Sequence, residues 1–113
     1  MRTNFDMQYQ NITMVKGDTL AFNIEVFNES GQPVTVDSAY MTCKKDPTGE
    51  DFVFQKSLGA GIQQDDGLIT VRVAPTDTSD ADAGQYRYDM RIGLGDDIYT
   101  LMIGTLTLEQ DIT

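Results

Sequence analysis

The sequence predicts an all-β protein built from about seven to eight short antiparallel strands. Apolar and polar side chains alternate with a period of two in several runs, which is the pattern of half-buried strands. Turn-forming residues separate these runs at spacings of about 8–12 residues, as in β-sandwiches and barrels. No run of ten or more residues shows a helical stripe, so the crossover helices that an α/β fold needs are not expected.

Four runs carry the clearest alternation. Because successive side chains of a strand point to opposite faces, the apolar members of each run are expected to share the face that covers the core. The inward sets are Leu20, Phe22, Ile24 and Val26; Ala39, Met41 and Cys43; Ile69, Val71 and Val73; and Tyr86, Tyr88, Met90 and Ile92.

Turn residues close these runs. Asp65-Asp66-Gly67 is a strong hairpin signal, because Gly accepts positive φ without steric cost. Asp46-Pro47-Thr48-Gly49 has Pro at the first central position of a turn. Further turns are expected at Lys16-Gly17-Asp18, at residues 29–33 and at residues 93–97.

Two segments depart from simple alternation. The last strand, residues 98–109, changes parity along its length, and a bulge near Gly104 would reconcile the two halves. Residues 75–83 begin with Pro and contain Thr76, Thr78 and Ser79, any of which could cap a single helical turn.

The composition argues against several classes of function. The chain has 113 residues, a net charge of -10, one Cys and no His. One domain is expected, with an N-terminal arm at residues 1–9 and a sandwich at 10–113. Without His, and with a single Cys, a Ser-His-Asp hydrolase, a zinc site and an intrachain disulfide are not expected. The acidic balance argues against nucleic acid and anionic membranes as partners.

We therefore expect no enzyme, no cofactor and no metal. Residues 1–10 lack the apolar run of a signal peptide, and no uncharged stretch reaches the length of a membrane-spanning helix. These observations favour a soluble protein made in a reducing cytoplasm.

The segment from Asp82 to Tyr88 is the most informative. Immunoglobulin-like sandwiches often carry Asp-x-Gly-x-Tyr-x-Cys at the corner that leads into their sixth strand, where the Tyr hydroxyl bonds to backbone upstream. Here Asp82, Gly84 and Tyr86 match that pattern, and Tyr88 stands in place of the Cys. The sequence thus predicts a single immunoglobulin-like β-sandwich without a disulfide, and a structural role for these four residues.

A wider resemblance covers residues 10–113. It rests on the order of four motifs: Lys16-Gly17-Asp18-Thr19-x-x-Phe22, Gly31-Gln32-Pro33-Val34, Gly84-x-Tyr86-x-Tyr88-Asp89 and Gly104-Thr105-Leu106-Thr107-Leu108. The chain resembles small immunoglobulin-like modules of bacteriophage virions, similar to the N-terminal domain of siphophage upper baseplate proteins. The resemblance implies a virion structural protein of the tail, baseplate or neck. It would be made in the host cytoplasm, be present in many copies and dock onto other virion proteins, with no catalytic residues.

Other interpretations remain open. A capsid decoration protein belongs to the same class, and a carbohydrate-binding or adhesion module to a different one; an enzyme ranks third. Phe5, Met7 and Tyr9 lie outside the strand pattern, so the arm either packs on a neighbouring virion protein or folds back on its own sheet. Asp77, Asp80 and Asp82 could contribute to a calcium site, but solvated turn acids are the simpler interpretation.

Overall fold

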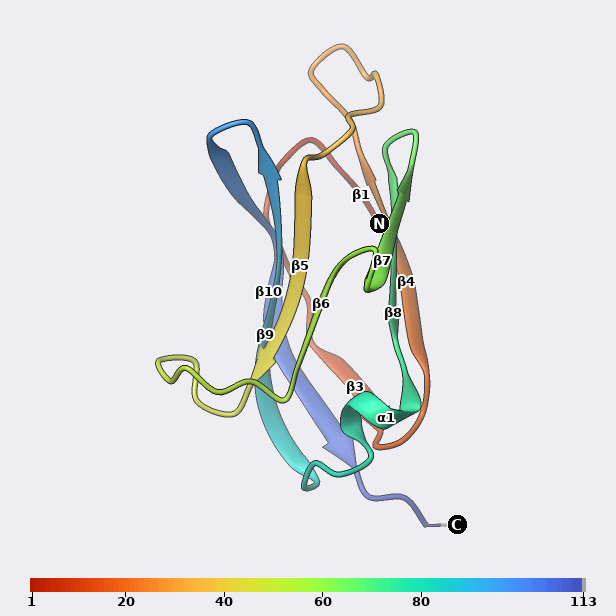
Figure 1. Ribbon diagram of the computed structural model, residues 1–113, viewed down its shortest axis with the longest axis vertical. Coiled ribbons are helices and arrows are strands. Elements are labelled where there is room, and N and C mark those ends of the chain that lie inside the picture. Colours follow the sequence, from red (N-terminus) through yellow and green to blue (C-terminus); the bar gives the residue numbers. More distant parts are fainter. Residues whose placement is uncertain (113) are drawn as a thin grey trace.

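The computed structural model describes residues 1–112, and it confirms the all-β class (Figure 1). The described residues contain ten strands and one short helix. Among them, no helix combines the length and the hydrophobicity that crossing a membrane requires. The elements are β1 (Arg2–Thr3), β2 (Gln8–Tyr9), β3 (Ile12–Val15), β4 (Leu20–Val26), β5 (Ser38–Lys44), β6 (Phe54–Leu58), β7 (Gly61–Asp65), β8 (Leu68–Val73), α1 (Pro75–Thr78), β9 (Gly84–Leu94) and β10 (Asp97–Glu109).

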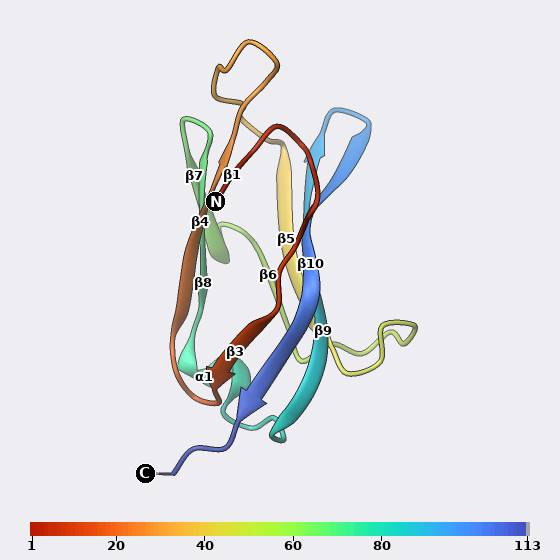
Figure 2. The same cartoon turned by 180° about the vertical axis from the view of Figure 1, so that it is seen from behind.

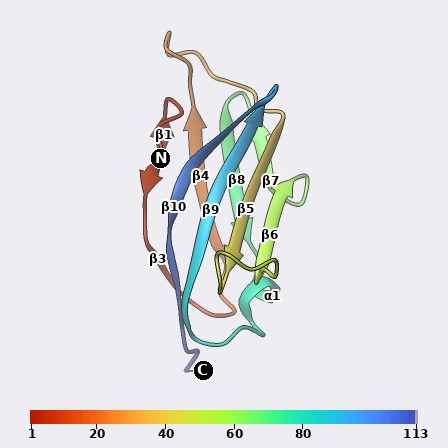
Figure 3. The ribbon, with the colours of Figure 1, turned by 90° about the vertical axis from the view of Figure 1, so that its left-hand side faces the viewer.

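All ten strands belong to one curled sheet in the order β1-β4-β8-β7-β6-β5-β9-β10-β2, with β3 also paired to β10. The curl places β5, β9 and β10 opposite β4, β7 and β8 (Figures 1 and 3). The strand β6 pairs with both β5 and β7 and so connects the two layers. The sheet is mixed: β1/β4, β2/β10, β3/β10 and β6/β7 are parallel pairs. The sequence predicted antiparallel pairing apart from possible mixing at the edges, so the parallel pair β6/β7 inside the sheet was not expected.

The core lies between the two layers and is formed by the predicted inward faces. Met41, Cys43, Ile69, Val71 and Met90 are fully buried, and Ile24 and Val73 join them. Leu20 and Phe22 keep the predicted parity but are only half-buried, because β1 pairs only with Glu25 and Val26 and leaves the first half of β4 at the open edge of the sheet. Alternation along each strand is what puts these side chains on one side.

The N-terminal arm folds back on its own sheet. Figure 2 shows the chain leaving β1 beside β4 and crossing to β10, where β2 and β3 pair. The Met1 amino group donates to the Asn23 carbonyl at 3.1 Å, and the Phe5 ring packs on Tyr99 with centroids 4.8 Å apart. The boundary expected at residue 9 thus falls between two short strands of the same sheet.

The parity change in β10 lies earlier than predicted. The pairing with β9 shifts between Thr100 and Met102, so that Leu101 and Met102 are both buried. The bulge prediction at Gly104 was wrong, and this glycine has a different function. A Cβ at Gly104 would collide with the Gln10 carbonyl, so glycine is what lets the N-terminal segment lie directly on β10.

The connections are held locally. The β7–β8 hairpin forms as predicted, with Asp66 at φ 51° and Gly67 at φ 83°, the positive values of a type I′ turn. The helical turn α1 is present. Of the predicted capping residues, Ser79 is its C-cap and donates its backbone N–H to the Pro75 carbonyl, whereas the N-cap is Ala74, which was not predicted. The Asp77 carboxylate accepts from the Ala74 N–H at 2.7 Å and pairs with Lys56 Nζ at 2.6 Å.

Candidate functional site

The corner predicted at Asp82, Gly84, Tyr86 and Tyr88 lies where the chain leaves α1 and enters β9. The Tyr86 hydroxyl donates to the Asp82 carbonyl at 2.6 Å, and its ring is almost fully buried. Burial, helped by the nearby Asp82 carboxylate, raises the pKa of the Tyr86 phenol. A neutral hydroxyl that is already donating to backbone holds the loop against the strand.

Tyr88 fixes a more distant part of the chain. Its hydroxyl donates to the Gln10 carbonyl at 2.5 Å, 78 residues away in sequence. Burial raises the pKa of the Tyr88 phenol to about 12. The ring faces the core beside its cross-strand partner Cys43, and the hydroxyl ties β9 to the segment between β2 and β3.

Cys43 is fully buried, and desolvation raises the pKa of its thiol to about 12. The thiolate is the reactive form of cysteine, and at neutral pH this side chain is a protonated thiol packed in the core. Cys43 therefore acts as a small apolar residue.

Asp77, Asp80 and Asp82, the acidic residues considered for calcium, lie on α1 and on the loop that leads to β9. Asp77 is engaged with Lys56 and with the Ala74 N–H. Within residues 1–112, no three Cys, Asp or Glu side chains converge in a way that could hold a metal ion.

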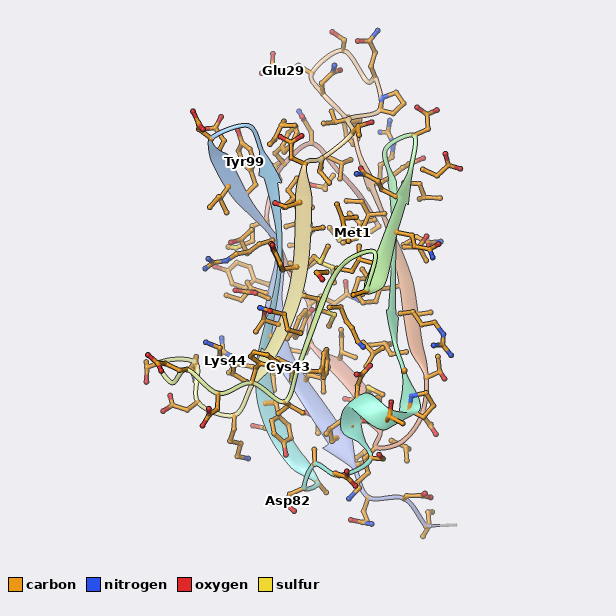
Figure 4. The ribbon with its side chains drawn as sticks, viewed as in Figure 1. Met1, Glu29, Cys43, Lys44, Asp82 and Tyr99 are labelled. Atoms are coloured by element: carbon orange, nitrogen blue, oxygen red, sulfur yellow. The ribbon has the colours of Figure 1, made fainter. Side chains whose placement is uncertain are left out.

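The candidate functional site is the outward side of the layer formed by β6, β5, β9, β10 and β2. Lys44 lies on this side of β5, whereas its neighbour Cys43 points to the core (Figure 4). The strand register sets three rows of outward side chains across the layer. We call this surface the outer face and define it by Tyr9, Tyr40, Thr42, Lys44, Glu50, Phe52, Gln55, Arg87, Asp89, Arg91 and Ile103.

The outer face holds three aromatic side chains exposed to solvent. Tyr40 and Phe52 are 46% and 53% exposed and border a shallow hollow of about 520 Å³. Tyr9 is 81% exposed and pairs with Ile103 at the outer edge of the layer. The sequence singled out Tyr9 but missed Tyr40 and Phe52, because only the fold brings these two rings to the same hollow. Tyr9 lies farther along the outer face, separated from β5 by β9 and β10.

The predicted partner-contact residues separate in the structure. Phe5 is half-buried against Tyr99 and serves the fold. Met7 and Tyr9 remain exposed, and Tyr9 belongs to the outer face.

Charge on the outer face is arranged unusually. Lys44 and Arg87 are directly opposite each other on β5 and β9, and like charges in that position repel. The Lys44 ammonium donates to the Gly49 carbonyl at 2.8 Å, and its charge also interacts with the Asp46 carboxylate. Asp89 is already paired with Arg91 at 3.2 Å. Arg87 has no ion-pair partner within residues 1–112, so the outer face can accept an anionic group there, beside its aromatic rings.

Comparisons with known proteins bear on the fold alone. No family model matches the chain, and no curated protein matches it. Among solved structures it is similar to an endo-beta-1,4-mannanase from Thermotoga petrophila, with a TM-score of 0.56 and 9% identity over 89% of this chain and 18% of that one. It also matches a family 123 glycoside hydrolase from Clostridium perfringens, with a TM-score of 0.45 and 11% identity over 91% of this chain and 23% of that one.

The chain thus spans about a fifth of the length of these two proteins. At 9% identity the likeness to the mannanase concerns the path of the backbone. The fold defines the protein as a member of the all-β class, a curled sheet around a single core.

Proposed function

We propose that the protein is a non-enzymatic structural component of a bacteriophage virion, in the tail, baseplate or neck, which docks onto other virion proteins. The observation that carries this proposal is the outer face. It places exposed aromatic rings and arginines side by side on a rigid sheet, and these residue types are enriched in protein interfaces. The order of the four sequence motifs that resemble phage modules adds to it.

The reactive side chains support a passive role. Cys43 is held as a protonated thiol, and both corner tyrosines donate their hydroxyl protons to backbone carbonyls. Asp77 is occupied by an ion pair and a helix cap. Each of these groups has a structural partner, which suits a module whose work is done by its surface.

Mass spectrometry of purified particles from the phage or prophage that encodes the chain tests this proposal. We expect the chain in intact virions and in isolated tails, and we expect its deletion to leave particles without complete tails. Finding it in isolated heads would favour capsid decoration instead. Particles that lack the chain entirely would overturn the proposal.

A carbohydrate-binding or adhesion module is the second candidate, and the three exposed aromatic rings of the outer face favour it. Sugar rings stack on aromatic faces, so Tyr40 and Phe52 beside the hollow would be the contacts. Titration with mannan- and cellulose-derived oligosaccharides distinguishes the two. Binding that is lost in Tyr40→Ala and Phe52→Ala, in a chain absent from virions, would replace the first candidate with the second.

A further inference from the structure

We propose that the outer face is the docking site for the β9–β10 turn of a second copy of this chain. In this contact Asp96 and Asp97 of one copy lie on Lys44 and Arg87 of the next, and Ile98 packs against the aromatic border of the hollow. The inference rests on the proposed function in one respect, since a virion module present in many copies needs a contact between copies.

The receiving surface is defined by Arg87, a basic residue of the outer face that forms no ion pair in the described part of the chain, and by Lys44 opposite it. The chain has 8 Lys and Arg against 18 Asp and Glu, yet three of the eight basic residues lie on the outer face. Among the described residues, Arg87 has no ion-pair partner, and it stands opposite Lys44. A like-charge pair across two strands is unfavourable in the isolated molecule, and an anionic group bound between the two would relieve it.

The turn that would be bound has the complementary chemistry. It projects at one end of the molecule, away from α1 and the C-terminus (Figure 1). Asp96 and Asp97 give it two adjacent carboxylates, and Ile98 beside them is 71% exposed. Its shape is fixed, because the Gly95 N–H donates to the Asp37 carboxylate at 2.6 Å. A turn that is already rigid loses little entropy on binding.

The β9–β10 turn and the outer face are complementary both in charge and in hydrophobicity. The acidic pair faces the basic pair, and an exposed aliphatic side chain faces an exposed aromatic border. At physiological ionic strength charges more than about 8 Å apart are largely screened, which weakens the repulsion between two chains of net charge -10 more than the attraction between charges in contact.

The contact is necessarily between molecules. The turn is continuous with β9 and β10, which themselves form the outer face, so it cannot fold onto its own cations. Turn and face are different surfaces, so the contact is head-to-tail and repeats from copy to copy as a ring or filament. One turn buries far less than the roughly 1,200 Å² of a stable interface, so free copies should associate weakly and in a salt-dependent way.

Sedimentation analysis of the full chain across a wide concentration range tests the contact. We expect the mean mass to rise with concentration at about 0.1 M salt, and the rise to be largely lost at about 1 M, where the Debye length falls from about 10 Å to about 3 Å. Arg87→Glu and the double variant Asp96→Lys/Asp97→Lys should each weaken association at least tenfold. Arg72→Glu is the matched control, because it changes the net charge equally from an exposed position on β8.

Mixing the two defective variants is the decisive step. The Arg87→Glu copy still carries an acidic turn, and the Asp96→Lys/Asp97→Lys copy still carries a basic face, so the mixture should associate more strongly than either variant alone. Circular dichroism and thermal melts establish that each variant is folded.

A wild-type chain that stays monomeric at every concentration, or a mixture that does not associate, would overturn the proposal. If the outer face binds an oligosaccharide and Arg87→Glu leaves that binding unchanged, the proposed contact between copies would be overturned in favour of a glycan ligand. Virion mass spectrometry is independent of all these results, so failure of the contact and failure of the virion role can be told apart.

Discussion

Replacing Tyr88 with Phe removes one oxygen atom and tests how the N-terminal segment is attached. The ring remains, so buried apolar area is unchanged and only the hydrogen bond to the Gln10 carbonyl, 2.5 Å long, is lost. A typical net hydrogen bond contributes about 1 kcal/mol, within a range of about 0.5–1.5. Gln10 lies in an exposed segment where water can replace the phenol, so we expect a loss of about 1 kcal/mol.

Urea denaturation measures this loss, and the dependence of the unfolding free energy on urea should keep its slope because the fold is unchanged. The melting temperature should fall by about 4 °C for a domain of this size. Tyr88→Ala is the comparison: it also removes a buried ring and should cost about 3–5 kcal/mol. If Tyr88→Phe matched the wild type, or cost as much as Tyr88→Ala, the account of this residue would be refuted.

Alkaline pH gives the same reasoning a second test. The pKa of the Tyr88 phenol is about 12 in the folded protein against 10.0 when unperturbed. The unfolded chain therefore releases this proton first, so the stabilising contribution of Tyr88 is complete below about pH 10 and is lost as the pH rises toward 12. The stability difference between wild type and Tyr88→Phe should narrow over this interval in urea titrations. A constant difference would show that the phenol is not desolvated.

Three further predictions follow from buried contacts. Gly104→Ala should cost about 1–3 kcal/mol and expose the amides of residues 8–15 to hydrogen exchange, because the new Cβ meets a backbone carbonyl; Gly49→Ala, with only ordinary contacts, should be near neutral. Cys43 should resist a thiol reagent at pH 8 until the protein unfolds, and rapid labelling of the native chain would contradict its burial. Asp77→Ala should cost about 1–2 kcal/mol through the lost helix cap, and Asp77→Asn, which retains an acceptor, should cost less in the same urea assay.

The sequence patterns identified the core residues but not the outer face. Inward residues such as Met41 and Met90 can be recognised in the sequence, because a strand with one buried face carries apolar side chains at alternate positions. Outward residues carry no such constraint. Lys44 and Arg87 are 43 positions apart, and nothing in their local sequence shows that β5 and β9 place them opposite each other.

Close approaches between distant backbone segments could not be predicted from the sequence either. Gly104 was interpreted as a bulge, since glycine within a strand is often found at one. The observed shift between Thr100 and Met102 has no glycine, and Gly104 is required by a contact with a residue 94 positions away. The role of a glycine can be predicted from its neighbours when they impose the backbone conformation. The Asp66-Gly67 turn is such a case, because its positive φ values depend only on the hairpin itself.

The sequence by itself determined the all-β class, the inward face of each main strand and the hairpin at Asp66-Gly67, because these follow from side-chain alternation and backbone sterics within a few residues. Only the tertiary structure decided that the N-terminal segment completes the sheet through parallel pairs, that the parity of β10 shifts at residue 101, and that three aromatic rings and two opposed cations share one face. Those features depend on register between strands far apart in the chain, and register is set by the packing of the whole sheet around its core.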